Sequence, residues 1–437
     1  AERAPGLRHA VVVAQHDNPA GLIGQLQRRL DEQVRLPWPA LPAASPISLR
    51  SARTGLAAVE ETAFEGEPPE AVDLATQRRR QQITSGAGAL EQAFALPEGH
   101  TFSRDSNAIA LSGRNTAVAM VHIDGMGFGQ LFRRFDAALQ GHPQHVPWRK
   151  CLSEAVAAVV RTAARRAIEG VVAARPIVLG GDDLTILLAG VHALPFTVRF
   201  LEAFEDGSRA ALEPLRRALR DDPGTARAAQ VLPETLTAAA GIAFIHSHFP
   251  AVLAHDLAFE ICDWVKRHLR PSDERPGCSG LALHRVTASH CAGWGEVLER
   301  DLERNEREGR LRLTMAPYVL GEPPNGHFRI AALTNLYEAS RKLPRGAWRE
   351  IATLAALSRR QADLRFQRLV EIGRRSADDD YRQAIEDVVT ELSDLSAKTD
   401  GPPGFWFATA DGWMTPWVDV AALRGVDREI PGMTEGA

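Results

Sequence analysis

Residues 116–129, with the sequence TAVAMVHIDGMGFG, decide the fold. The stretch begins as an apolar run typical of a buried strand and reaches a carboxylate, Asp124, that is followed at once by glycines. A glycine turn that leads from a strand into a helix presents backbone N–H groups to an anion. The third glycine of a dinucleotide-binding fingerprint is absent, because Gln130 stands there, and Asp124 would repel a pyrophosphate. The turn therefore either closes an ordinary strand–helix connection or binds an anion across an intervening cation.

A second motif, GGDD at residues 180–183, joins apolar runs at residues 176–179 and 184–189. Gly and Asp are the residues that a tight hairpin favours, so a plain turn is one interpretation. Asp182 and Asp183 are adjacent carboxylates between apolar strands, and they repel each other and lose solvation unless a metal ion or solvent compensates. The motif is therefore also a candidate cation site.

Hydrophobic periodicity around these motifs predicts an α+β fold. The predicted order is β-α-β-β-α-β-α-β, which is the plan of a ferredoxin-like palm with an extra strand and helix, and we expect its helices on one face of the sheet. In this plan the hairpin lies beside the first strand. Helices are expected over residues 131–139, 151–171, 198–219 and 251–269, and further strands over 238–246 and 281–286.

The same plan brings Asp124, Asp182 and Asp183 to one edge of the sheet. Three carboxylates beside a glycine-rich phosphate cradle have the layout of a phosphoryl-transfer site that uses two divalent cations. Mg²⁺ prefers few protein carboxylates together with substrate phosphates, which fits this arrangement. The sequence therefore predicts two Mg²⁺ or Mn²⁺ ions on these residues.

Composition limits the function classes. The chain has 437 residues, with 51 Lys and Arg against 55 Asp and Glu, so it has no global basic field for nucleic acid. Residues 341–375 are locally basic, and either solvated helix charge, an RNA backbone or an acidic sister subunit explains them. The few cysteines form no C-x-x-C pair, and no apolar run approaches the ~20 residues that cross a bilayer, so we expect a cytoplasmic protein without a membrane partner.

Three regions are predicted along the chain. Residues 1–100 read as a partial first-palm-like or linker region, residues 101–325 as the palm with the GGDD motif, and residues 326–437 as a C-terminal helical domain with a Trp-rich tail. The tail tryptophans are expected to be core or docking residues.

Three motifs carry a family resemblance. HIDGMG at residues 122–127, LGGDD at 179–183 and GIAFIH at 241–246 occur in this order, and together they resemble the second palm of the CRISPR polymerase family. That family supplies the large subunit of type III CRISPR effector complexes and is related to the GGDEF-type nucleotide cyclases. The resemblance covers residues 115–290. It implies an antiviral nucleotidyltransferase that converts ATP to cyclic oligoadenylate second messengers when target RNA activates it.

The resemblance also implies roles for individual residues. Asp124, Asp182 and Asp183 would be the catalytic ligands of the two cations, and guide RNA, target RNA and other type III CRISPR subunits would be partners. Met126 departs from the family pattern, which often has a polar residue at that position. The implied nucleotide-binding residues are Gly125, Met126, Gly127, Phe128, Gly180, Gly181 and Lys266.

Other interpretations stay open at this point. Lys266 could be a solvated lysine on a helix face. His122 shares the face of Asp124 and could orient that carboxylate or fill space, and the pair His246 and His248 has metal-ligand spacing but closes a strand. The whole protein could be a catalytically silent architectural subunit of an RNA-guided complex, or a stand-alone cyclic dinucleotide synthase outside CRISPR.

Overall fold

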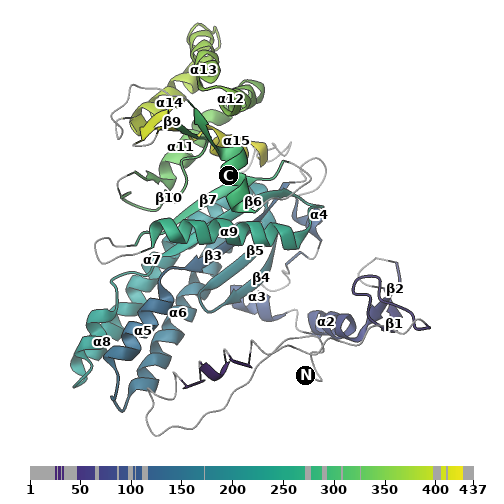
Figure 1. Cartoon of the computed structure of the whole chain (residues 1–437), viewed down its shortest axis with the longest axis vertical. Coiled ribbons are helices and arrows are strands. Elements are labelled where there is room, and N and C mark those ends of the chain that lie inside the picture. The colour runs from purple at the N-terminus through teal and green to yellow at the C-terminus, as the bar shows by residue number, and fades with distance from the viewer. Residues whose placement is uncertain are drawn as a thin grey trace.

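The computed structural model has one large sheet with helices around it, a helical C-terminal part and a small N-terminal unit (Figure 1). Residues 1–24, which belong to the predicted first-palm-like region, lie outside the described residues. The structure describes residues 25–26, 28–30, 32–33, 47–63, 68–85, 88–96, 102–103, 105–110, 117–171, 173–270, 277–287, 293–306, 309–324, 326–396, 405–409 and 412–426.

The large sheet is mixed, and the strand that ends in the first motif lies in its interior. The order across the sheet is β11 (Phe328–Arg329), β10 (Tyr318–Val319), β7 (Gly280–Arg285), β6 (Ala238–His246), β3 (Ala117–Gly125), β5 (Asp183–Ala189) and β4 (Ala174–Gly180). β3 pairs antiparallel with β5 on one side and with β6 on the other, β4 pairs antiparallel with β5, and β6 pairs parallel with β7.

Helices connect these strands and agree closely with the periodicity of the sequence. The helices are α5 (Phe128–Ala138), α6 (His145–Ile168), α7 (Gly190–Asp221), α8 (Ala226–Val231) and α9 (Ala251–Leu269). α9 and β6 have the predicted bounds, whereas α7 begins eight residues earlier than predicted and contains Pro195 and Pro214.

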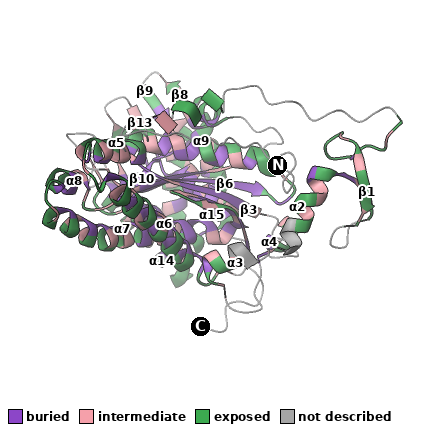
Figure 2. Cartoon of the chain, turned by 90° about the horizontal axis from the view of Figure 1, so that it is seen from below, coloured by how far each residue is buried: buried purple, intermediate pink, exposed green. Residues whose placement is uncertain are grey.

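The α+β class agrees with the prediction, but the expectation that helices cover one face of the sheet is wrong. α9 lies on one face, where the ring of Phe259 is 5.3 Å from that of His122, and α6 and α7 lie on the other (Figure 2). Met120 and Val121 point to opposite faces of β3, and both are fully buried. The nearly unbroken apolar run of β3 is the signature of a strand that is covered on both sides.

The C-terminal part combines helices with a second sheet. Its four strands join residues 303–312 to residues 407–414 of the tail. The predicted core role of the tail tryptophans holds for Trp417, which is fully buried and stacks on Trp348 with ring centroids 3.7 Å apart. The elements are α10 (Trp294–Val297), the π-helix η1 (Leu298–Leu302), β8 (Glu303–Glu306), β9 (Gly309–Arg312), α11 (Ile330–Arg341), α12 (Arg345–Leu357), α13 (Arg359–Arg374), α14 (Asp379–Ser396), β12 (Phe407–Thr409), β13 (Gly412–Met414) and α15 (Trp417–Val426).

The N-terminal elements form a small unit to one side of the large sheet (Figure 1). Asp73 begins its helix, since one carboxylate oxygen accepts hydrogen bonds from the backbone of Ala75 and Thr76. Within the described residues, no helix is both long and apolar enough to span a membrane. The unit contains β1 (Ala58–Thr62), β2 (Glu70–Asp73) and α2 (Leu74–Ser85), and α3 (Gly88–Phe94) and α4 (Ser106–Ile109) lead from it to the sheet.

Candidate functional site

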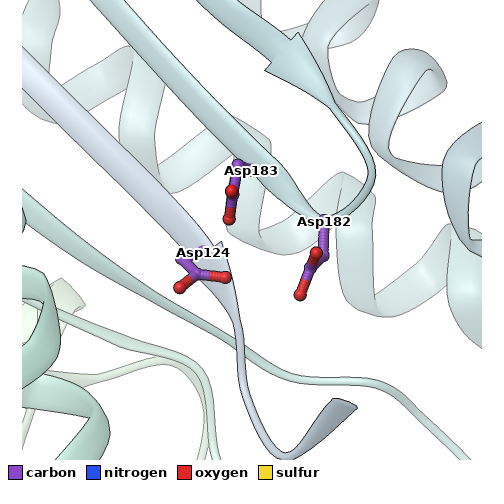
Figure 3. Close-up of side chains that lie close together, drawn as sticks. All are labelled: Asp124, Asp182 and Asp183. Carbon is purple, nitrogen blue, oxygen red and sulfur yellow. The ribbon is translucent and has the colours of Figure 1, made fainter. Parts of the chain in front are cut away.

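Three aspartates meet at one end of the central strands. Asp124 lies near the end of β3, Asp183 opens β5 directly opposite it, and Asp182 lies in the turn between β4 and β5. One carboxylate oxygen from each residue lies within 4.8 Å of the other two, and Figure 3 shows the side chains directed toward a common space. In the described part of the chain, this is the one group of three or more side chains that could hold a metal ion. The structure thus brings together the carboxylates that the sequence predicted at one edge.

The hairpin turn fixes the position of Asp182. Gly180 pairs with Asp183, so the turn between them has two residues, and Gly181 has a φ of 62°, which glycine adopts without strain. The backbone N–H of Gly125 donates to the carbonyl oxygen of Asp182 at 3.3 Å. This bond joins the turn to the end of β3, and it explains how carboxylates 58 positions apart in the chain become neighbours.

The cluster carries more negative charge than its surroundings favour. Burial, together with the hydrogen bond and the charge of Asp124, raises the pKa of Asp183 to about 7. Burial also raises the pKa of Asp182, again with a contribution from the charge of Asp124. Carboxylates at this spacing cannot all ionise near neutral pH without a positive charge between them. The cluster therefore favours either a shared proton or a bound cation.

Lys266 supplies one positive charge to the cluster. Its ammonium group, in the last turn of α9, donates to a carboxylate oxygen of Asp124, and the two side chains are only 17% and 20% exposed. The interpretation as a solvated surface lysine is therefore wrong. Sequence similarity alone indicated this position, because Lys266 is 142 residues from Asp124 in the chain.

The glycine turn after β3 depends on a close approach. A Cβ atom on Gly125 would lie 1.7 Å from the ring of Phe128, so a side chain at this position would collide with that ring. Gly127 has a φ of 75° and precedes α5, which gives the helix a start without a side-chain cap. Phe128 is buried, so its contribution to the site is the packing of its side chain and the position of its backbone.

A cavity of about 720 Å³ opens beyond this turn. Met126 lines it, and the backbone N–H of Met126 donates to the carbonyl oxygen of Thr237 at 2.8 Å. Sequence reasoning missed the polar helical residues Arg134, Glu205 and Arg209 of its wall, because isolated charges on helices have no distinctive spacing. The cavity has the size of a small-molecule site and adjoins the residues that follow Asp124.

The two histidine interpretations have separate outcomes. The Nδ1 atom of His122 lies 2.8 Å from the hydroxyl of Thr185, and burial lowers the pKa of His122 to about 4, so the ring is neutral and packs under α9. The Nδ1 atom of His246 accepts a hydrogen bond from the backbone N–H of His248 at 3.1 Å, which is a turn contact. These partners favour structural roles for both histidines.

Comparisons of the chain with protein-family models and with curated proteins find no match.

Proposed function

We propose that this chain is a palm-type nucleotidyltransferase that requires divalent cations. The order β6-β3-β5-β4 is antiparallel throughout, with helices between β3 and β4 and between β5 and β6. This arrangement supports a ferredoxin-like palm that β7, β10 and β11 extend.

The observation that carries the proposal is the aspartate cluster beside the glycine turn. Its donors are all carboxylate oxygens, which suit Mg²⁺ or Mn²⁺ rather than softer metals. The raised pKa of Asp183 indicates charge that a cation would neutralise. The residues present therefore fit the proposed ions, which Asp124, Asp182 and Asp183 would hold.

Each part of the site has a separate task in this chemistry. Two divalent cations supply charge neutralisation and activation of an attacking hydroxyl when they are bound. The three aspartates are held in place by the β3–β5 ladder and the hairpin, so no reorganisation is needed when substrate arrives. Lys266 can exchange its contact with Asp124 for a phosphate oxygen. The start of α5 has no side-chain cap, and uncapped N–H groups at a helix start can bind phosphate.

The finer assignment follows from the family resemblance. We propose ATP as the substrate and cyclic oligoadenylate as the product, in a cytoplasmic type III CRISPR complex with guide RNA, target RNA and sister subunits. The cavity beyond Met126 is large enough for the base and sugar of a nucleotide.

Product analysis by mass spectrometry tests this function. The purified chain is incubated with each nucleoside triphosphate and Mg²⁺ or Mn²⁺, with and without candidate RNA. We expect oligoadenylate products from wild type and none from the double variant Asp182→Asn/Asp183→Asn. The control is Asp379→Asn/Asp380→Asn, an adjacent aspartate pair in the exposed first turn of α14. Equal products from wild type and both double variants would refute the proposal.

The Lys266–Asp124 contact also favours a second candidate, a silent architectural palm. An internal ammonium group can neutralise the cluster permanently, in place of a cation. In that case guide RNA and sister subunits would bind, and the assembled complex would not turn over nucleotides even with target RNA. Synthesis of a cyclic dinucleotide without any RNA would instead favour a stand-alone cyclase.

A further inference from the structure

Another cavity lies between the large sheet and the C-terminal helices. Its volume is about 450 Å³, and α9, β7, η1, α12 and α15 contribute to its wall. Pockets of this size, with apolar walls and a few polar groups, are typical of small-molecule sites. The larger apolar side chains of the wall are Leu257, Leu283, Val286, Val297, Leu302 and Val418.

Asp419 gives this cavity one polar atom without a partner. The residue is only 3% exposed and lines the cavity from the first turn of α15. Thr314, the backbone of Met315 and Tyr318 all donate hydrogen bonds to one carboxylate oxygen, Oδ2. Within the described residues, the other oxygen, Oδ1, has no hydrogen-bond partner, and it is not enclosed by protein atoms. Oδ1 is therefore the atom that a molecule in the cavity can contact.

His284 gives the cavity a second polar group. It lies in β7, and its ring packs edge-on against that of Trp294, with centroids 5.9 Å apart. Burial lowers the pKa of His284 to about 4, although the charge of Asp301 opposes this, so the ring is neutral. In the part of the chain that the structure describes, neither ring nitrogen has a hydrogen-bond partner. A neutral imidazole therefore offers one N–H donor and one acceptor nitrogen here.

An unusual helical turn forms another part of the wall. η1 is a π-helix of five residues, and Arg300, Asp301 and Leu302 of this turn line the cavity. π-Helical turns are rare and occur frequently at functional sites. The Nε atom of Arg300 lies 2.9 Å from a carboxylate oxygen of Asp301, so the charges of the turn neutralise each other.

These groups favour an uncharged ligand. Asp419 donates a hydrogen bond when it is protonated and accepts one when it is ionised, and His284 can do either. An ion would lose its solvation against the apolar walls without gaining an opposite charge that is free to pair with it. Nucleobases have the matching chemistry, because a flat ring carries N–H donors beside acceptor nitrogen or oxygen atoms. A volume of about 450 Å³ also leaves room for the sugar.

We propose that this cavity binds a nucleobase or nucleoside, with Asp419 and His284 as its hydrogen-bond partners. The ligand would contact β7, η1, α12 and α15 together, and it would join the large sheet to the C-terminal part.

The cavity is separate from the aspartate cluster. His284 pairs with Ala243, and Ala243 pairs with Met120, which is four residues from Asp124 along β3. Four residues of a strand span about 13 Å. The proposal therefore does not depend on the function of the aspartate cluster.

The test measures nucleoside binding to the full chain in excess chelator, so that the aspartate cluster holds no divalent cation. The probes are adenosine, guanosine, cytidine and uridine, each followed by calorimetry, and ribose is the control for the sugar alone. Ala352→Leu places a larger side chain in the cavity, and His284→Leu removes the imidazole. The matched control is Ala356→Leu, the same change one turn later in α12, at an exposed position outside the cavity.

We expect at least one nucleoside to bind wild type more tightly than ribose does. Ala352→Leu should weaken that binding roughly tenfold or more, because its side chain and the ligand compete for the same space. His284→Leu should weaken it about fivefold, which is the effect of one lost hydrogen bond. Ala356→Leu and Asp182→Asn/Asp183→Asn should each change it less than about twofold, since both lie outside the cavity.

Three results would overturn the proposal. The first is that no nucleoside binds wild type more tightly than ribose, and the second is that Ala352→Leu and Ala356→Leu bind nucleosides equally well. The third is loss of nucleoside binding in Asp182→Asn/Asp183→Asn, which would place the nucleoside at the aspartate cluster. Circular dichroism shows whether each variant is folded. If Ala352→Leu does not fold, equal binding by His284→Leu and wild type overturns the proposal instead.

Discussion

The packing of α9 on the sheet can be tested most directly at Gly241. It lies in β6, between His122 of β3 and Ala282 of β7. A Cβ atom there would lie 2.1 Å from the carbonyl oxygen of Ala258 and 2.6 Å from the backbone nitrogen of Cys262. Ordinary contacts are about 3.5 Å, so Gly241→Ala forces α9 away from the sheet by about 1 Å or more.

The expected cost follows from this displacement. Overpacking of a core costs about 1–3 kcal/mol, and we expect the upper end because both neighbours are backbone atoms that cannot rotate away. A loss of about 3 kcal/mol lowers the melting temperature by roughly 6–12 °C for a domain of this size.

Thermal unfolding followed by circular dichroism measures the effect, with urea unfolding as the second probe. The control is Gly346→Ala in α12, where a Cβ atom would meet nothing within 4 Å and alanine favours the helix. If Gly241→Ala has the same melting temperature as the Gly346→Ala control, the described packing of α9 on β6 is contradicted.

Three further predictions concern polar groups. Burial raises the pKa of Asp419 from an ordinary 3.8 to about 7, so the folded state favours the protonated acid. The stability that protonated Asp419 contributes is therefore present at low pH and is lost as the pH rises through about 7. Arg312 and the hydrogen bond from Tyr318 oppose this rise of the pKa. Between about pH 5 and pH 8, the free energy of unfolding of wild type should therefore fall by about 2–3 kcal/mol relative to that of Asp419→Asn. Urea unfolding with the same pH dependence for both proteins would contradict this. Thr185→Val removes the partner of buried His122 and should cost about 1–3 kcal/mol in urea unfolding; unchanged stability would show that the bond is dispensable. Lys266→Met removes the ammonium group that neutralises the aspartate cluster, so the variant should have a lower melting temperature than wild type near pH 8. Millimolar Mn²⁺ should restore the melting temperature. A variant that is as stable as wild type without Mn²⁺ would contradict the role of Lys266.

Local sequence signals were sufficient for the central elements. The bounds of β6 and α9 follow from an apolar run and a periodic apolar face on either side of Pro250. The hairpin follows from its paired glycines and aspartates, and its position beside β3 follows from the order of elements.

Features that depend on distant contacts could not be predicted in this way. In the second sheet, β9 pairs with β13, which lies about a hundred residues further along the chain. Both strands are short, neither has an alternating apolar pattern, and no tight turn connects them, so no local signal predicts the pairing. Buried Asp419 accepts hydrogen bonds from Thr314, the backbone of Met315 and Tyr318, and a lone aspartate in a helix gives no sign of such partners. The burial of both faces of the sheet had a signal in the apolar run of β3, which the one-face plan overlooked.

The binding of Mn²⁺ tests most directly whether the three aspartates form a cation site. Electron paramagnetic resonance of free Mn²⁺, titrated with protein near pH 8 and near pH 6, gives stoichiometry and affinity. We predict that wild type and Asp379→Asn/Asp380→Asn bind alike, that Asp182→Asn/Asp183→Asn binds at least about tenfold more weakly, and that wild type binds more weakly near pH 6, where Asp183 holds a proton. Equal Mn²⁺ binding by wild type and Asp182→Asn/Asp183→Asn would contradict the account.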